Sequence, residues 1–171
     1  MSRKKGFSLV ELLIVLAVMA ALIATITPVA LNAIKKSKAT QVAQNLKTLA
    51  SAIENAAYVN GVDENGIKEP NGIGHFTEED DIKLLARDIN VDHYGIAYKI
   101  YTGTDAGKIA VYIRTNESVD PGIVAETLMS ATEVTSAIAN ADDYKVIGND
   151  FTTATTGIQY TFTFKGSSTI I

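Results

Sequence analysis

The stretch KKGFSLVELLIVLAVMAALIA, residues 4–24, decides how the rest of the chain is interpreted. A basic pair and a glycine precede an apolar run, and one carboxylate, Glu11, lies near the start of that run. From Phe7 to Leu31 the apolar character covers about one bilayer crossing, which takes ~20 residues of helix. The sequence therefore predicts an apolar helix over 7–31 that spans a membrane or packs against sister helices, and it carries an acidic residue that needs an explanation.

Two simpler interpretations of this segment leave features unexplained. A cleavable secretory signal ends at a small-residue site of the A-x-A type, and none of the alanines between Ala17 and Ala33 forms that spacing. A plain single-pass anchor has no need of Glu11, because an acidic side chain costs roughly 2.5–3.5 kcal/mol at the bilayer centre and less near its edge. Glu11 therefore favours a third interpretation, in which the carboxylate has a partner.

That partner is supplied if the chain is cut after Gly6. Phe7 then gains a free amino group, and this cation lies four residues before Glu11 at one end of an apolar helix. In a neighbouring subunit shifted along a common axis, the amine of one chain can meet the carboxylate of the next. Each charge is costly in lipid alone, so their pairing lowers the cost of both and fixes the axial register.

The sequence K-K-G-F-S-L-V-E-L-L-I-V resembles the class III signal of bacterial type IV pilins and of the pseudopilins of type II secretion. In that family a prepilin peptidase cuts after the glycine and N-methylates the new first residue, and the glutamate four positions on is needed for assembly. The resemblance covers residues 1–55. It implies a cleaved leader over 1–6, cleavage between Gly6 and Phe7, N-methylation of Phe7, and a role in filament assembly for Phe7 and Glu11.

Pro28 lies at a depth where members of this family commonly carry a proline. A proline in a helix interior removes one backbone donor and crowds the carbonyl four residues before it, here that of Ala24, at a cost of ~3 kcal/mol. Thr25 and Thr27 flank it and could satisfy the freed backbone groups. The residues leave a simple kink and a local break equally open. The resemblance implies a helix break at Pro28, since family filaments melt there into an extensible segment.

After Pro28 the pattern becomes amphipathic, and residues 32–60 predict a continuation of the same helix with one buried face. The apolar positions recur at spacings of four, three, four and four residues: Val42, Leu46, Leu49, Ile53 and Ala57. The pattern ends at Asn60 and Gly61, a common helix stop. The basic cluster Lys35, Lys36 and Lys38 is expected at lipid headgroups, but three basic residues on each flank leave the membrane orientation undecided.

Residues 61–171 predict a globular α+β head. Three or more strands need one covered face, and the stripe of 42–57 is the natural cover. The fold class is thus a long N-terminal helix whose apolar half protrudes and whose C-terminal half packs on a small antiparallel sheet. The expected elements are a loop over 61–76, a short helix opened by a capping box at Thr77–Asp80 with Ile82, Leu85 and Ile89 on one face, a hairpin over 94–101 and 108–114, a helix capped by Asp120 and Pro121 that carries Val124, Leu128, Ala131, Val134 and Ile138, and a last strand over 158–164.

The head shows no residue set for catalysis. The net charge is −4, and without the leader's Arg3, Lys4 and Lys5 it is −7, which argues against nucleic acid as a partner. There is no cysteine, so disulfides and thiolate metal sites are excluded. His75 and His93 are isolated, the acidic run 78–81 is best explained by the helix dipole, and the Asn116–Ser118 sequon is a weak match. The sequence predicts neither an enzyme nor a cofactor or metal site.

The favoured function is a structural subunit of a type IV pilus-like filament, a helical homopolymer built through the N-terminal helices. The resemblance implies that its partners are its own copies, a prepilin peptidase, an inner-membrane assembly platform and, before assembly, membrane lipid. It also implies a single pass through the inner membrane first and a cell-surface pilus afterwards. A pseudopilin of a type II secretion or competence system is the alternative, since many major pilins have a C-terminal disulfide loop that this chain lacks. A non-polymerising, membrane-anchored binding module is the third hypothesis.

Overall fold

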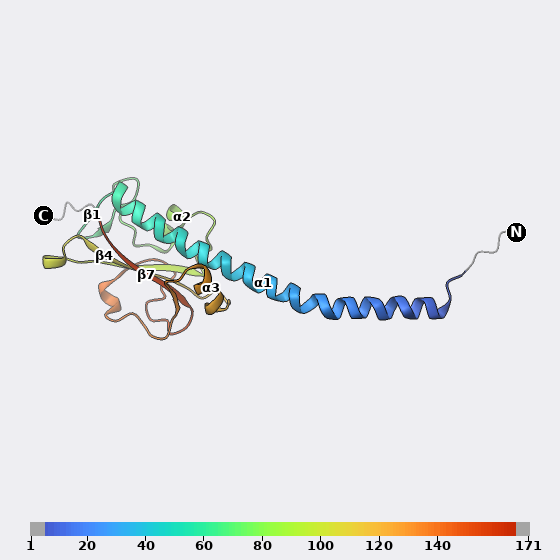
Figure 1. Ribbon diagram of the computed structural model, residues 1–171. Helices are drawn as coiled ribbons and strands as arrows, with labels where there is room; N and C mark the ends of the chain where they lie inside the picture. The colour runs from blue at the N-terminus through green and yellow to red at the C-terminus, as the bar shows by residue number, and fades with distance from the viewer. Residues whose placement is uncertain (1–5, 167–171) are drawn as a thin grey trace. The chain divides into compact units, whose positions relative to one another are not determined.

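The computed structural model describes residues 6–166, so the predicted leader over 1–6 lies, except for Gly6, outside the described residues. The chain forms two units, Met1–Lys38 and Ala39–Ile171. The helices and strands are α1 (Leu9–Val59), β1 (Val62–Asp63), β2 (Gly66–Ile67), the 3-10 helix η1 (Glu79–Asp81), α2 (Ile82–Leu85), β3 (Tyr94–Ile100), η2 (Gly103–Asp105), β4 (Lys108–Thr115), α3 (Pro121–Thr127), β5 (Ala131–Glu133), η3 (Ala141–Asp143), β6 (Lys145–Gly148) and β7 (Ile158–Lys165). Figure 1 shows these elements along the chain.

Helix α1 is 51 residues long and ends where the sequence predicts. Leu, Ala and Ile dominate its first half, and Gly61, with a φ of +87°, takes up the left-handed conformation that commonly follows a helix. From residue 39 onward one face of the helix is buried, and it holds every position of the predicted stripe together with alanines between them: Ala39, Val42, Ala43, Leu46, Leu49, Ala50, Ile53 and Ala57.

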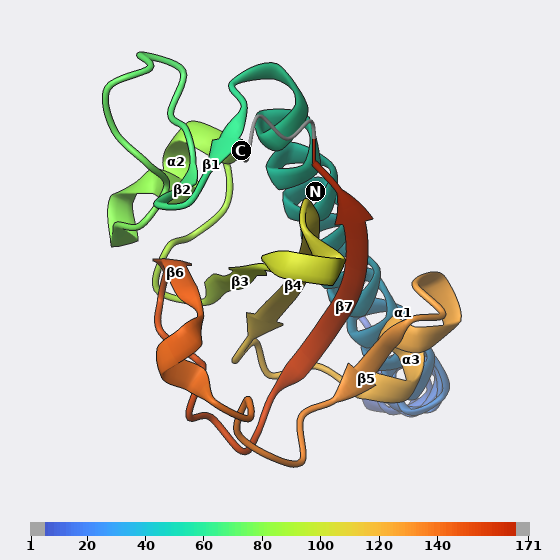
Figure 2. The same cartoon turned by 90° about the vertical axis from the view of Figure 1, so that its left-hand side faces the viewer.

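The head is built on a five-stranded antiparallel sheet in the order β5-β7-β4-β3-β6 (Figure 2). The predicted hairpin is confirmed, with Tyr94 opposite Thr115 and Ile100 opposite Ile109. The predicted last strand is also confirmed as β7, which pairs with β4 along all eight of its residues. An α+β fold with a long N-terminal helix and a small antiparallel sheet is therefore correct.

One face of the sheet packs on residues 39–59 of α1 and forms the core. The buried side chains on this face of the sheet are Tyr94, Ile96 and Tyr98 of β3, Ile109, Val111 and Ile113 of β4, Ile147 of β6 and Ile158 of β7. Burying apolar area of this kind is the main favourable term in folding. Two tyrosine hydroxyls keep partners inside the core: Asn45 of α1 donates to Tyr94 over 3.1 Å, and Tyr98 donates to the carbonyl of Phe76 over 2.8 Å.

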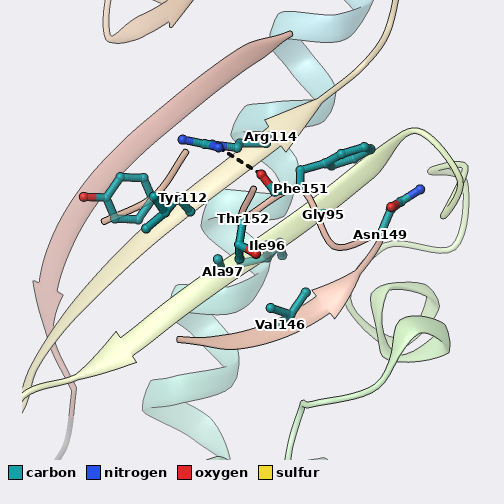
Figure 3. A pocket seen from close by; sticks show the side chains of 10 residues that line it. Gly95, Ile96, Ala97, Tyr112, Arg114, Val146, Asn149, Phe151 and Thr152 are labelled. Atoms are coloured by element: carbon teal, nitrogen blue, oxygen red, sulfur yellow. Dashed lines mark hydrogen bonds between the residues drawn. The ribbon is translucent and has the colours of Figure 1, made fainter. Parts of the chain in front are cut away.

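The opposite face of the sheet is covered in part by residues 134–138 and 149–157, which lie in the chain on either side of β6, and Arg114 of β4 holds this cover in place (Figure 3). The guanidinium donates to the carbonyls of Phe151 over 2.9 Å, Ala154 over 3.1 Å and Ser136 over 3.1 Å. It also donates twice to the side-chain oxygen of Gln159, over 3.2 and 3.0 Å. All five described bonds go to neutral acceptors, so Arg114 is a buried cation that clamps the cover to the sheet.

Gly95, the second residue of β3, allows the cover to come close. A Cβ at this position would overlap the backbone carbonyl of Asn149 and press on the ring of Phe151. The backbone N–H of Asn149 in turn donates to the carbonyl of Tyr94 over 3.1 Å. The sheet therefore has packed layers on both faces over β3, whereas the sequence predicts a cover for one face only.

The predicted helix over 121–138 is wrong beyond Thr127. Asp120 does cap it, accepting from the N–H of Gly122 over 2.8 Å, with Pro121 at the first helical position. Residues 131–133 then form β5, because Ala131 pairs with Tyr160 of β7 at the edge of the sheet. The residues after β5 enter the cover, where Val134 and Ile138 are buried. Pairing with the distant strand β7 overrides the local helical spacing.

Two shorter predictions in the head are also corrected. The expected loop over 61–76 contains the β1–β2 hairpin. The Tyr98 hydroxyl of β3 accepts from the backbone N–H of Ile67 over 3.2 Å and so holds this hairpin against the sheet. The helix expected to reach Ile89 ends at Leu85, since Ala86 has an extended backbone. Its capping box lies one residue later than predicted, with the Asp81 carboxylate accepting from the N–H of Glu78 over 2.8 Å.

Candidate assembly site at the start of helix α1

The residues of the predicted cleavage and assembly site lie together at the N-terminal end of α1. Gly6, Phe7 and Ser8 precede the helix, which begins at Leu9, so the Gly6–Phe7 bond lies outside helical backbone. Glu11 lies in the first turn, where a negative charge is stabilised by the helix dipole. Phe7 is 89% exposed.

Glu11 and Ser8 cap the first turn of α1. The Glu11 carboxylate accepts, through Oε2, from the backbone N–H of Ser8 over 2.8 Å. The Ser8 hydroxyl accepts from the backbone N–H of Val10 over 3.3 Å, and the Ser8 carbonyl accepts the first helical bond from Leu12 over 3.1 Å. The spacing S-x-x-E is that of a capping box, in which the serine hydroxyl accepts from the N–H of the glutamate. Here the hydroxyl accepts from Val10 instead, so only the half of the box made by the Glu11 carboxylate is formed.

Every described residue from Gly6 to Lys38 is exposed. The apolar part of this range has a mean hydropathy of 2.8 over 18 residues, none of them buried, and the helix is long and apolar enough by length and composition to cross a membrane. An apolar surface of this size on a soluble monomer is exceptional. The segment is therefore suited to lipid, to other apolar helices, or to both in turn.

The polar groups within the apolar segment are satisfied by its own backbone. Thr27 donates to the carbonyl of Ile23 over 2.7 Å, and Thr25 donates to that of Leu22 over 2.9 Å. These acceptors are not the carbonyl of Ala24, so the expectation that the threonines satisfy the group freed by Pro28 is wrong. Helix α1 continues through Pro28 in the single chain, and a break there remains a prediction for the filament.

The predicted candidates in the head have ordinary structural partners. His75 Nε2 lies 2.9 Å from a carboxylate oxygen of Asp63, and His93 Nδ1 lies 2.7 Å from the side-chain oxygen of Asn116. Among residues 6–166 no group of three or more histidine, aspartate or glutamate side chains is placed to hold a metal ion. Burial raises the pKa of Tyr98, which is a buried hydrogen-bonding residue rather than an exposed ring for a ligand.

The cavity beside Arg114 does not form a ligand site. It lies between β3, β4 and the cover (Figure 3) and has a volume of about 10 Å³, which is the space of one water molecule. A wider hollow on α1 is lined by six residues of that helix alone, among them Gln44, Lys47 and Asn55, and is open to solvent. Neither hollow gathers the convergent polar groups that a small-molecule site has.

Residues 1–27 match the protein-family model described as the prokaryotic N-terminal methylation motif. This is the class III signal of type IV pilins and pseudopilins, so the resemblance seen in the sequence is confirmed over that segment. No curated protein and no solved structure gave a significant match to the chain. The motif supports a type IV pilin or pseudopilin, points to a structural subunit rather than an enzyme family, and implies processing by a prepilin peptidase.

Proposed function

We propose that the protein is a structural subunit that polymerises into a type IV pilus-like filament through its N-terminal helix. The observation that carries the proposal is the combination at the start of α1: a methylation motif, with Glu11 in the first turn of an apolar helix that is exposed from residue 9 to residue 38. A sequence motif alone indicates processing. An uncovered apolar helix supports a further step, in which that helix is buried against others.

The driving force for assembly is the burial of apolar side chains between Phe7 and Ile34. Each large aliphatic side chain that is fully buried gains about 1.5–3 kcal/mol relative to its exposed state in water, although lipid already provides much of that gain before assembly. Packing and charge pairing must therefore select the filament over the membrane. The amine of Phe7 meeting the carboxylate of Glu11 in an adjacent copy provides that selection.

The proposed pathway runs through two environments. The precursor crosses the inner membrane once. The apolar N-terminal part of α1 fits such membrane anchoring before assembly. The peptidase removes the leader after Gly6 and methylates Phe7, and an assembly platform then moves the subunit into a filament at the cell surface. The break at Pro28 belongs to this last state.

Major pilin is the first choice among subtypes and pseudopilin the second candidate. The absence of cysteine favours the second candidate, since many major pilins close a C-terminal loop with a disulfide. In this chain the Arg114 clamp holds a surface segment in place by hydrogen bonds. Imaging of fibres that contain the chain, followed by tests of motility, adhesion, DNA uptake and secretion, separates the subtypes.

Mass spectrometry of the mature N-terminus tests the processing steps. We expect a chain that begins at methylated Phe7. The variant Gly6→Val should retain the leader because the cut in the resembled family follows a glycine, and a mature product of unchanged mass would refute that assignment.

The variant Glu11→Ala tests the charge pair. We expect processing to remain intact while the amount of the chain in sheared surface filaments falls by an order of magnitude or more. Glu126→Ala is the matched control, because Glu126 is an exposed glutamate on α3 of the head. Filaments as abundant in Glu11→Ala as in the wild type would contradict the pairing, and a wild-type chain that never enters filaments would favour the membrane-anchored binding module.

A further inference from the structure

Strand β7 has no neighbouring strand along part of one side. It pairs with β4 over its full length, but β5 pairs only with its first three residues, Ile158, Gln159 and Tyr160. Among the described residues no strand pairs with Thr161–Lys165 on the side away from β4. Figure 2 shows this open side at the arrowhead end of β7. We call the outward side of residues 161–165 the free edge.

The backbone groups of every second residue of β7 point to the free edge. Successive residues of a strand direct their N–H and C=O groups to opposite sides. The carbonyl of Gly157 accepts from Val134 on the β5 side over 2.9 Å, and the N–H of Gly166 donates to Gly107 on the β4 side over 2.9 Å. The odd-numbered residues therefore direct their backbone groups away from β4, and on the free edge these are Thr161, Thr163 and Lys165.

The free edge lacks most of the features that protect an unpaired strand. Such strands are usually short, bulged, or interrupted by proline or charge. Strand β7 keeps an unbroken register with β4, contains no proline, and carries its one charge at its last residue, Lys165. Its threonine, tyrosine and phenylalanine residues favour strands. An edge of this kind is a template for a further strand.

A row of aromatic side chains lies beside the free edge, on the face of the sheet that packs on α1. Phe162 and Phe164 are half-buried, with ring centroids 5.8 Å apart. The rings of Tyr160 and Tyr58 continue the row at its two ends, at 5.5 and 5.8 Å. An added strand would place every second side chain beside these rings, so it gains most from an apolar residue there.

Residues 167–171, which lie outside the described residues, have the sequence Ser-Ser-Thr-Ile-Ile and follow Gly166. Three of these five are β-branched and favour a strand, and five extended residues match the length of the free edge. Pairing over this full length places Thr169 opposite Thr163, whether the added strand runs parallel or antiparallel to β7. Ile170 then lies on the same face of the sheet as the aromatic row.

The free edge suits this segment from a second copy better than from the same chain. At Gly166 the chain still continues the ladder with β4, so a return along β7 needs a turn after this residue. Two-residue hairpin turns favour Gly, Asn or Asp, and Ser167 and Ser168 provide none of these. Pairing of β7 with β7 of another copy would close into a two-fold dimer, whereas exchange of residues 167–171 is head-to-tail and can continue along a filament.

We propose that the free edge of β7 binds residues 167–171 of an adjacent copy, which add a sixth strand to the five-stranded sheet. This inference rests on the proposed function, because a filament brings copies together in a repeating head-to-tail order. Main-chain hydrogen bonds to the free edge provide affinity, and the aromatic row provides a preference for the apolar side chain of Ile170.

Introduced cysteines test the contact directly, since the chain has none of its own. One copy carries Thr163→Cys, and a co-expressed, affinity-tagged copy carries Thr169→Cys. Opposite residues of paired strands lie about 4.5–5.5 Å apart, within reach of a disulfide. After mild oxidation of purified filaments we expect a mixed disulfide dimer, severalfold more abundant than with Thr153→Cys in place of Thr163→Cys, because Thr153 is exposed but lies in the cover.

The other outcomes of the cysteine test overturn the proposal. Filaments without the mixed dimer would do so and leave the proposed function standing. A dimer formed as readily by Thr163→Cys alone would show that β7 pairs with itself. A disulfide within one chain that carries both changes would show that the segment returns to its own sheet. A wild-type chain that forms no filament would overturn the proposed function and, with it, this inference.

Thr163→Pro tests the backbone contact. The N–H of Thr163 points to the free edge, so proline should leave the sheet folded, with an unchanged near-ultraviolet circular dichroism spectrum. Its entry into filaments beside the wild type should fall severalfold, while Thr163→Val, which keeps the N–H, should enter normally. Truncation after Gly166 removes the other partner and should lower entry to a similar extent. Normal entry of the truncated chain, or of a folded Thr163→Pro variant, would overturn the proposal.

Discussion

Replacing Arg114 by methionine should destabilise the head more than any other single change at a charged residue of the sheet. Methionine keeps much of the apolar stem and fills a similar volume, so the change removes the guanidinium and little else. Five hydrogen bonds disappear, and the carbonyls of Ser136, Phe151 and Ala154 lose the donor that joins them to β4.

The size of the effect follows from two opposing contributions. Burial lowers the pKa of the Arg114 guanidinium, and removing a buried cation recovers its desolvation cost of several kcal/mol. Against this, each buried carbonyl left without a donor costs about 1–3 kcal/mol, and the lost bonds were made by a charged donor. We expect a net loss of about 2–4 kcal/mol, which corresponds to a fall in Tm of roughly 6–15 °C for a head of this size.

Near-ultraviolet circular dichroism of the full chain in detergent is the appropriate assay. All seven tyrosines lie in the second unit, Ala39–Ile171, between Tyr58 and Tyr160, whereas the far-ultraviolet signal is dominated by α1. Arg87→Met is the matched control: Arg87 is exposed, and its replacement should change the free energy of unfolding by less than about 0.5 kcal/mol. If Arg114→Met unfolds at the same temperature as Arg87→Met, the clamp does not hold the cover.

Two further perturbations test the hairpin β1–β2 and its contacts. Tyr98→Phe removes the hydroxyl that joins Ile67 to Phe76, so it should cost about 1–3 kcal/mol, seen in urea unfolding, and speed exchange of the Ile67 amide. Because burial raises the pKa of Tyr98, wild-type stability should also decline as the pH rises above 10, where the unfolded chain ionises, and Tyr98→Phe should weaken that decline. Partial burial raises the pKa of Asp63, but hydrogen bonds from His75 and a backbone N–H outweigh it, so the net pKa is lowered. The resulting stabilisation is present above pH 3.8 and is lost as the pH falls through the folded pKa. Asp63→Asn should therefore make the free energy of unfolding depend less on pH below about pH 4.

Local periodicity was enough to predict the elements whose packing partner faces them directly. The stripe Val42–Ala57 is buried throughout, and β3, β4 and β7 follow the alternation of their side chains. The helix expected over 121–138 shows where this reasoning fails. Val124, Ala131 and Val134 are buried as the spacing predicts, but they lie in a helix, a strand and a loop, so the helical spacing is a coincidence of three elements.

Strands β5 and β6 and the cover could not be predicted from local sequence patterns, because contacts between residues distant in the sequence determine them. Lysine and glycine flank the two central residues of β6 and give little strand signal, yet Ile147 pairs with Ile96. Nothing in the residues around Arg114 indicates that it is buried, since its acceptors are three backbone carbonyls and the Gln159 side chain, all more than 20 residues away. The N-terminal site could be predicted because all its residues lie in one short contiguous segment.

Gly95 has a consequence for how heads of this kind can diverge. Strand β3 accepts no side chain at this position while Asn149 and Phe151 lie over it, so a mutation here is tolerated only in a lineage that has already lost or rebuilt the segment above. We therefore expect the glycine and the overlying segment to be inherited or discarded together. A homologous sequence with a bulky residue at this point of its third strand should carry a shorter excursion before its final strand.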